Sequence, residues 1–163
     1  MKADVYFIAD TPGKGLAIMP RPRGGEWLMN EVMAWKEAGI NVVVSLLEDS
    51  EIDELELREE GSSCESMGME FLRVPISDRG VPDSSCPVTA LVGSLVEKLK
   101  AGHGVSIHCR MGIGRSGLIA ACVLVSLGHD IDEAWESIAE ARGFPVPDTK
   151  AQRDWVAHWA TLH

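Results

Sequence analysis

The sequence lacks the features that identify several classes of protein. Among its 163 residues, the longest largely apolar stretch covers residues 117–128, which is far too short to span a bilayer. The first apolar run, residues 5–9, is also too short for the hydrophobic core of a secretory signal. We therefore expect a cytoplasmic protein without a membrane partner.

Basic residues and paired cysteines are also scarce. Fifteen Lys and Arg residues stand against 25 Asp and Glu residues, a formal net charge of −10, which argues against a nucleic-acid partner. The four cysteines form no C-x-x-C pair, so the sequence predicts free thiols in a reducing compartment and no zinc site. We expect no metal and no cofactor, and the sequence indicates no oligomeric state.

Short apolar runs alternate with amphipathic stretches along the chain. The runs are rich in Val and Ile, which is typical of buried strands, and they cover residues 5–9, 16–19, 41–47, 70–76 and 104–108. Helical spacing of apolar residues predicts helices over residues 27–39, 88–99, 117–127, 131–138 and 155–162. This alternation predicts one α/β domain over residues 1–163. We expect a central, mostly parallel sheet of about five strands, flanked by helices, and a helical C-terminal third.

One segment, residues 48–60, concentrates the negative charge. It holds eight acidic residues and a single base, and the rest of the chain is close to charge balance. Two interpretations remain open at this point. The segment is either a solvated acidic helix or loop, or a surface that steers the choice of partner by its charge.

The segment that indicates chemistry follows the last predicted strand. The strand brings His108 and Cys109 to its carboxyl end, and residues 110–115 then turn before an apolar helix. Gly112 and Gly114 relax the backbone, so that successive N–H groups can point inward. Inward N–H groups and a helix N-terminus form a cradle for an anion, and this positive environment favours a thiolate at Cys109. Such a thiolate is a nucleophile for a bound tetrahedral anion.

The residues around the cysteine complete a phosphate site. We expect the anion to be held by the loop residues Arg110, Met111, Gly112, Ile113, Gly114 and Arg115. Arg115 offers a planar guanidinium that binds phosphate in a bidentate manner. Ser116 is placed to donate a hydrogen bond to the sulfur. A purely structural thiol is the better interpretation for Cys122, but it does not explain the glycines and the arginine that follow Cys109.

The pattern His108-Cys109-x5-Arg115-Ser116-Gly117 resembles the signature of the cysteine-dependent protein-tyrosine and dual-specificity phosphatases. The chain is similar in size and element order to the compact dual-specificity group, and residues 75–83 resemble the acid loop of the cyclin-dependent-kinase-associated phosphatases. The resemblance implies a hydrolase for phosphotyrosine, and also for phosphoserine and phosphothreonine, acting through a cysteinyl-phosphate. Its partner would be a phosphorylated protein or a small phosphomonoester.

The resemblance also implies roles for individual residues. Asp78, which follows Pro75-Ile-Ser and lies 31 positions before Cys109, would be the general acid, and Asp83 would cap the helix that begins near Pro87. If Asp78 is an ordinary turn residue instead, Asp83 is the alternative acid. His108 would tune the thiol and the loop through hydrogen bonds. Gln152 resembles a late glutamine that positions water, or it is an exposed helix residue.

Two other functions stay open. The first is hydrolysis of a non-protein phosphate such as an inositol phosphate, a phosphoinositide or an RNA 5′ phosphate. The absence of lysine from the loop interior argues against highly charged inositol lipids. The second is a catalytically weak module that only binds phosphorylated groups. The presence of Cys109, Arg115 and Asp78 together argues against it.

Overall fold

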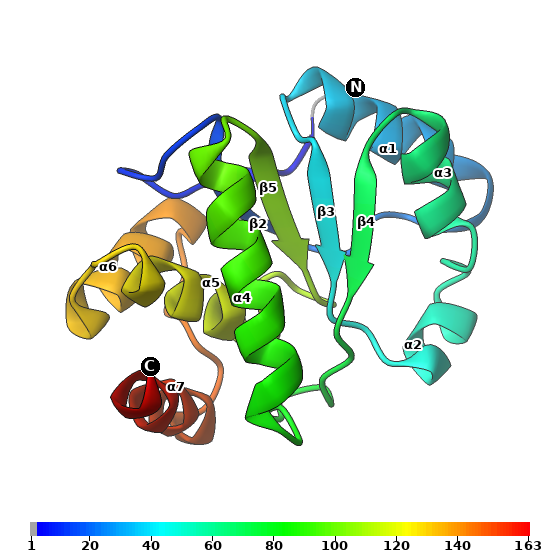
Figure 1. The fold of residues 1–163 in the computed structure, drawn as a ribbon. Helices are drawn as coiled ribbons and strands as arrows, with labels where there is room; N and C mark the ends of the chain where they lie inside the picture. Colours follow the sequence, from blue (N-terminus) through cyan, green and yellow to red (C-terminus); the bar gives the residue numbers. More distant parts are fainter. Residues whose placement is uncertain (1–2) are drawn as a thin grey trace.

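A five-stranded sheet with the order β1-β2-β5-β3-β4 forms the centre of the computed structural model, which describes residues 3–163 (Figure 1). Four strands are parallel: β2 (Gly15–Met19), β5 (Gly104–His108), β3 (Val42–Ser45) and β4 (Glu70–Arg73). The short edge strand β1 (Tyr6–Phe7) pairs antiparallel with β2. This arrangement confirms the predicted α/β fold. The central strand β5 is wholly buried, as its apolar run indicates, and has the predicted range.

Helices cover both faces of the sheet. The face around Val43 is covered by α1 (Leu28–Glu37), preceded by the 3-10 turn η1 (Gly25–Trp27), and by α3 (Glu60–Ser66), which follows the short α2 (Asp49–Glu54). The face around Ile107 is covered by α4 (Ser85–Lys100), α5 (Gly114–Ser126), α6 (Ile131–Arg142) and α7 (Lys150–Leu162). In Figure 1, the arrows of β3, β4 and β5 point to the same edge of the sheet. Ligands of open α/β sheets bind at this edge.

The helix starts differ from the sequence prediction at three places. Helix α7 begins at Lys150, five residues before Trp155. Helix α5 begins at Gly114, so Arg115 lies in its first turn rather than in the preceding loop, together with Ser116. Helix α4 begins at Ser85, two residues before Pro87, and its N-cap residue Ser84 makes no side-chain capping bond. The prediction that Asp83 caps this helix is wrong, because within residues 3–163 its exposed side chain accepts no hydrogen bond.

Two further properties concern the described part of the chain as a whole. In residues 3–163, every helix is too short or too polar to cross a membrane. The same residues bring together no three His, Cys, Asp or Glu side chains suited to a metal ion. That no metal is needed stays a prediction, as does the single phosphatase domain over residues 1–163.

Candidate active site

Cys109 lies at the carboxyl end of the central strand, directly below the N-terminus of α5. Its side chain is almost fully buried, and the Oγ hydroxyl of Ser116 donates a hydrogen bond to Sγ at 2.8 Å, as predicted. Ser116 reaches the sulfur because it stands in the first turn of the helix that follows the loop. A donor at this distance and a helix N-terminus both favour negative charge on the sulfur.

The backbone of the loop that follows Cys109 is anchored from outside. Four consecutive carbonyl groups accept hydrogen bonds: Arg110 from the Arg21 N–H at 3.1 Å, Met111 and Gly112 from the Arg142 guanidinium at 3.1 Å each, and Ile113 from the Gly117 N–H at 3.0 Å. Within residues 3–163, the N–H groups of residues 110–113 donate to no acceptor. A trans peptide points its N–H away from its C=O, so the anchored carbonyls of Arg110, Met111 and Gly112 turn the N–H groups of the residues that follow them, 111–113, into the cradle.

Close packing leaves little room at two loop glycines. Gly112 has a φ of +73°, and a Cβ built on it would lie 2.4 Å from the carbonyl carbon of Met19. A Cβ on Gly114 would lie 2.2 Å from Oδ2 of Asp148, so a side chain there would require that carboxylate to move. Gly112 is the position that requires glycine, because its positive φ and the backbone of Met19 both disfavour a side chain.

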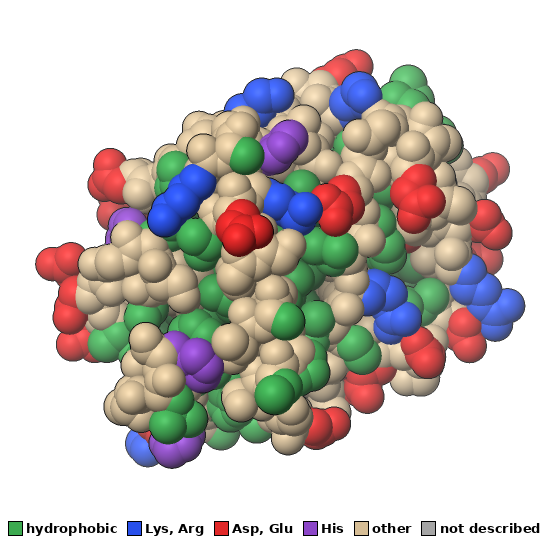
Figure 2. All heavy atoms as spheres, in the orientation of Figure 1, with side chains coloured by type: hydrophobic (Ala, Val, Ile, Leu, Met, Phe, Trp, Pro, Cys, Tyr) green, Lys and Arg blue, Asp and Glu red, His purple; other side chains and the backbone are tan. Residues whose placement is uncertain are grey.

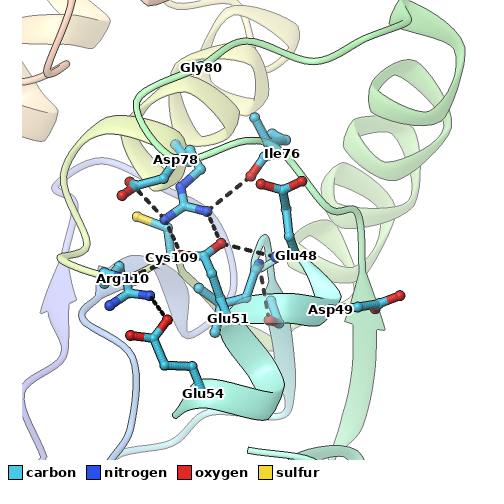
Figure 3. A network of polar contacts seen from close by, with 12 residues as sticks. Glu48, Asp49, Glu51, Glu54, Ile76, Asp78, Gly80, Cys109 and Arg110 are labelled. Atoms are coloured by element: carbon cyan, nitrogen blue, oxygen red, sulfur yellow. Dashed lines mark hydrogen bonds and ion pairs between the residues drawn. The ribbon is translucent and has the colours of Figure 1, made fainter.

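Arg115 is buried, with 1% of its surface exposed, and its guanidinium is surrounded by acceptors (Figure 3). Nη1 and Nη2 form a bidentate ion pair with Glu51 at 2.7 and 3.0 Å. Nη1 also donates to the carbonyl of Ile76, and Nη2 to Oδ1 of Asp78, both at 3.0 Å. The Nε–H donates to no acceptor in residues 3–163, so this side of the guanidinium is available to an anion in the cradle.

Glu51 is a site residue that the sequence analysis did not single out. Besides Arg115, its carboxylate accepts hydrogen bonds from Nε of Arg110 at 3.2 Å and from the backbone N–H of Glu48 at 3.1 Å. Burial alone would raise the pKa of Glu51. The hydrogen bonds from Arg115 and the backbone, with the positive charge of Arg115, outweigh burial and lower the pKa to about 2. Glu51 therefore stays ionised at neutral pH.

Glu60 gives the acidic segment a second contact with the site. His108 is fully buried, its Nε2 lies 2.5 Å from Oε2 of Glu60, and its Nδ1 lies 3.2 Å from the carbonyl oxygen of Cys109. Both ring nitrogens contact oxygen atoms, and these two contacts fix the orientation of the ring. Neither interpretation of residues 48–60 anticipated this. The segment is not a solvated face at Glu51 and Glu60, because these two carboxylates support the phosphate loop from below.

The remaining buried thiols differ from Cys109 in their surroundings. Burial raises the pKa of Cys64 to about 12, and the charges of Glu60 and Glu65 contribute in the same direction. Burial also raises the pKa of Cys122. The structure contains no disulfide among the described residues. Cys122, in the middle of α5, is the structural thiol that the sequence indicates.

The acid loop brings Asp78, and not Asp83, to the guanidinium of Arg115. The side chain of Asp78 is 55% exposed, so it lies at the mouth of the site, whereas Ile76 lies deeper. Gln152 holds this loop from α7, because its Nε2 donates to the carbonyl of Gly80 at 3.1 Å. Its Oε1 accepts from the N–H of Thr149 at 3.2 Å.

Gln152 itself is fully buried. The alternative of an exposed helix residue is therefore wrong. Its role in positioning water stays a prediction, because both ends of its amide contact protein groups in this structure.

A family model described as a DSP-PTPase phosphatase of polymorphic toxin systems matches residues 17–129, which is more than half of the chain. The chain belongs to this family. The match covers the end of β2, the strands β3, β4 and β5 and the whole phosphate loop, and it confirms the family that the His108–Gly117 motif resembles.

Individual relatives of this DSP-PTPase agree with the family. Human cyclin-dependent kinase inhibitor 3 is 36% identical over 85 residues, which cover 50% of this chain and 39% of that protein. The chain thus matches less than half the length of this relative. Kinase associated phosphatase, solved with a serine in place of its catalytic-site cysteine, has a TM-score of 0.89 and 20% identity, covering 99% of this chain and 96% of that one. PTPMT1 in complex with PI(5)P has a TM-score of 0.75 and 18% identity, covering 91% and 92%. At these identities, the two structures share the fold with this chain.

Proposed function

We propose that this DSP-PTPase hydrolyses phosphomonoesters of proteins, phosphotyrosine above all, through a cysteinyl-phosphate. One observation carries the proposal. The buried Sγ of Cys109 accepts a hydrogen bond from Ser116 and lies beside loop N–H groups and an Arg115 Nε–H that donate to no acceptor within residues 3–163. This arrangement binds a tetrahedral dianion and presents a thiolate to its phosphorus.

The reaction then has two steps. In the first, the Cys109 thiolate attacks phosphorus, an S–P bond forms, the P–O bond to the substrate breaks, and Asp78 gives its proton to the leaving oxygen. In the second, water attacks the cysteinyl-phosphate, Asp78 takes a proton from that water, and the S–P bond breaks to release phosphate and the thiolate. The loop N–H groups and Arg115 hold the phosphoryl oxygens in both steps.

The contact between Asp78 and Arg115 has a place in this sequence of events. In the structure, Asp78 occupies one Nη2–H of Arg115 at 3.0 Å. A bound phosphate dianion competes for the same guanidinium. Substrate binding would therefore release Asp78 from Arg115 and free its carboxyl group to face the leaving oxygen.

The charges around the loop favour a phosphoprotein over an inositol lipid. Apart from Arg115, Arg110 is the only cation in residues 110–115, and its guanidinium is bound by Glu51 at 3.2 Å and by Glu54 at 3.2 Å (Figure 3). Its charge is therefore compensated and not offered to a second phosphate group. PTPMT1, which shares the fold, was solved with PI(5)P, so lipid hydrolysis is the specific alternative to test.

A substrate panel with a nucleophile variant tests the proposal. The wild-type protein and Cys109→Ser would be assayed on a phosphotyrosine peptide, a phosphothreonine peptide of the same sequence, and PI(5)P in mixed micelles. We expect kcat/KM to be highest on the phosphotyrosine peptide and at least about tenfold lower on the lipid. Cys109→Ser should lower the rate by about 10⁴-fold or more while binding of inorganic phosphate persists.

Three results would contradict this function. Faster hydrolysis of PI(5)P than of both peptides would make the protein a lipid phosphatase. Substantial turnover by Cys109→Ser would exclude the thiolate mechanism. Tight binding of the phosphotyrosine peptide with no turnover in the wild-type protein would identify a binding module instead.

A further inference from the structure

Within residues 3–163, Arg142, at the end of α6, is the one side chain that binds two carbonyl groups of the phosphate loop. Its Nε donates to the carbonyl of Gly112 and its Nη2 to the carbonyl of Met111, both at 3.1 Å. The guanidinium also lies over two aromatic rings, 4.4 Å from the centroid of Tyr6 and 5.1 Å from that of Phe144. The arginine is thus fixed by contacts with β1 and with the segment after α6.

These two contacts set the direction of two loop dipoles. The carbonyl of Met111 belongs to the same peptide plane as the N–H of Gly112, and the carbonyl of Gly112 to the plane of the Ile113 N–H. Because a trans peptide is planar, a cation bound to both carbonyls turns both N–H groups to the opposite side. That side is the cradle, where these N–H groups have no acceptor among residues 3–163.

The other anchors of the loop cannot replace Arg142. The carbonyls of Arg110 and Ile113 are held by backbone N–H groups, and the carbonyl of Cys109 faces Nδ1 of His108. Each of these anchors holds one peptide plane. Gly112 has a positive φ, and a glycine can adopt more backbone conformations than an L residue. The middle of the loop therefore needs a hydrogen-bond donor from outside the loop to hold it in one conformation.

We propose that Arg142 is a positioning residue that fixes the two central peptide planes of the loop, so that the N–H groups of Gly112 and Ile113 face the bound phosphate. Arg142 acts through the backbone and does not touch the substrate, since Nε and Nη2 are bound to carbonyls and its guanidinium packs on two rings. The inference rests on the proposed function in so far as the cradle binds phosphate.

The test compares Arg142 with a matched arginine. Arg153 also lies over an aromatic ring, 5.0 Å from the centroid of Trp135, and donates to a backbone carbonyl, that of Val146 at 3.2 Å, but it makes no contact with the loop. The variants are Arg142→Met, Arg142→Lys and Arg153→Met. Three quantities are measured for each: kcat and KM on a phosphotyrosine peptide, the Kd for inorganic phosphate in a Cys109→Ser background, and the melting temperature.

We expect Arg142→Met to lower kcat/KM by about 10²-fold and to weaken phosphate binding by at least about tenfold, because two oriented donors are lost. The kcat/KM and the phosphate affinity of Arg142→Lys should lie between those of Arg142→Met and wild type. The reason is that an ammonium lacks the rigid planar fork with which the guanidinium binds both carbonyls. Arg153→Met should stay within about twofold of wild type in kcat/KM and Kd, even if its melting temperature falls as far as that of Arg142→Met.

Two results would overturn the proposal. One is a phosphate Kd and kcat for Arg142→Met within about twofold of wild type below its melting temperature. The other is an equal loss of binding in Arg153→Met. A wild-type protein that binds phosphate but hydrolyses no ester would overturn the proposed function alone, because the Kd comparison would still decide the role of Arg142. A Cys109→Ser protein with no phosphate binding would overturn both.

Discussion

At the scale of single residues, the proposed general acid is the carboxylate that reaches Arg115. Asp78 does so at 3.0 Å, whereas Asp83 lies five residues further along and is exposed, with no hydrogen bond to its side chain among the described residues. The sequence left both residues as candidates, because both stand in a loop before the same helix. The distance in the structure favours Asp78.

Replacing Asp78 should therefore affect poor leaving groups most. We expect Asp78→Asn to lower kcat on a phosphotyrosine peptide by about 10²-fold or more, and by a clearly smaller factor on p-nitrophenyl phosphate, whose leaving group needs little protonation. Asp83→Asn is the control and should keep both rates within about twofold of wild type. Steady-state rates on the two substrates check this. A stronger leaving-group dependence in Asp83→Asn than in Asp78→Asn would move the acid to Asp83.

At the scale of elements, the short helix α2 is joined to the phosphate loop by charge. Glu51 contacts Arg115 and Arg110 from α2, and Glu54, one turn later, contacts Arg110 at 3.2 Å. Figure 2 shows acidic and basic side chains next to one another over the α2 corner on the right, where Arg58 pairs with Asp53 and Arg73 with Asp49. The acidic segment is thus largely an ion-pair network and not a bare negative surface.

The ion pair of Glu51 should make stability depend on pH. Its pKa is about 2 in the folded protein against an ordinary value of 4.5. Between about pH 2 and pH 4.5, the unfolded chain therefore binds a proton at this carboxylate that the folded chain does not bind. The stabilisation is complete above about pH 4.5 and is lost as the pH falls through about 2. We expect Glu51→Gln to lower the free energy of unfolding by roughly 3 kcal/mol at pH 7, and by about half of that or less near pH 3.

Urea unfolding of wild type, Glu51→Gln and Glu54→Gln between pH 7 and pH 3 checks this dependence. Glu54→Gln is the matched control, because its side chain is 66% exposed and it pairs with Arg110 alone. An exposed pair contributes only about 0–1 kcal/mol, so this variant should change little at any pH. The ion-pair explanation fails if the destabilisation by Glu51→Gln is as large at pH 3 as at pH 7.

The elements also show what the sequence could and could not predict. Strand β5, the loop and the start of α5 form one contiguous stretch. The sequence of residues 104–117 is therefore sufficient to predict this part of the site. Glu51 lies 64 positions from Arg115, Glu60 48 positions from His108, and Arg142 30 positions from Gly112. These pairs meet only because the parallel sheet and its helices bring distant segments to one edge, and a charge run looks the same whether it is solvated or paired.

At the scale of the whole molecule, the net charge of −10 and the anion site are compatible because the charges are separated in space. Two of the eight acids in residues 48–60 are buried under the loop, and three more, Asp49, Asp53 and Glu54, are paired with arginines. The acids that still face solvent near α2 act at a distance on an approaching peptide, and salt screens them within about 10 Å at 0.1 M.

This remaining charge should select against acidic substrates. We expect the triple variant Glu48→Gln, Glu56→Gln, Glu59→Gln to raise kcat/KM on a phosphotyrosine peptide with acidic flanks by about three- to tenfold at low salt, with a basic-flanked peptide unchanged or slower. The gain should disappear near 0.5 M salt, where the charges are screened. A variant with the same charge change at the start of α6, on the opposite face of the sheet (Asp132→Asn, Glu133→Gln, Glu136→Gln), is the control and should leave the peptide preference unchanged. Equal effects in both triple variants would mean that net charge acts, and not the position of the acidic segment beside the phosphate loop.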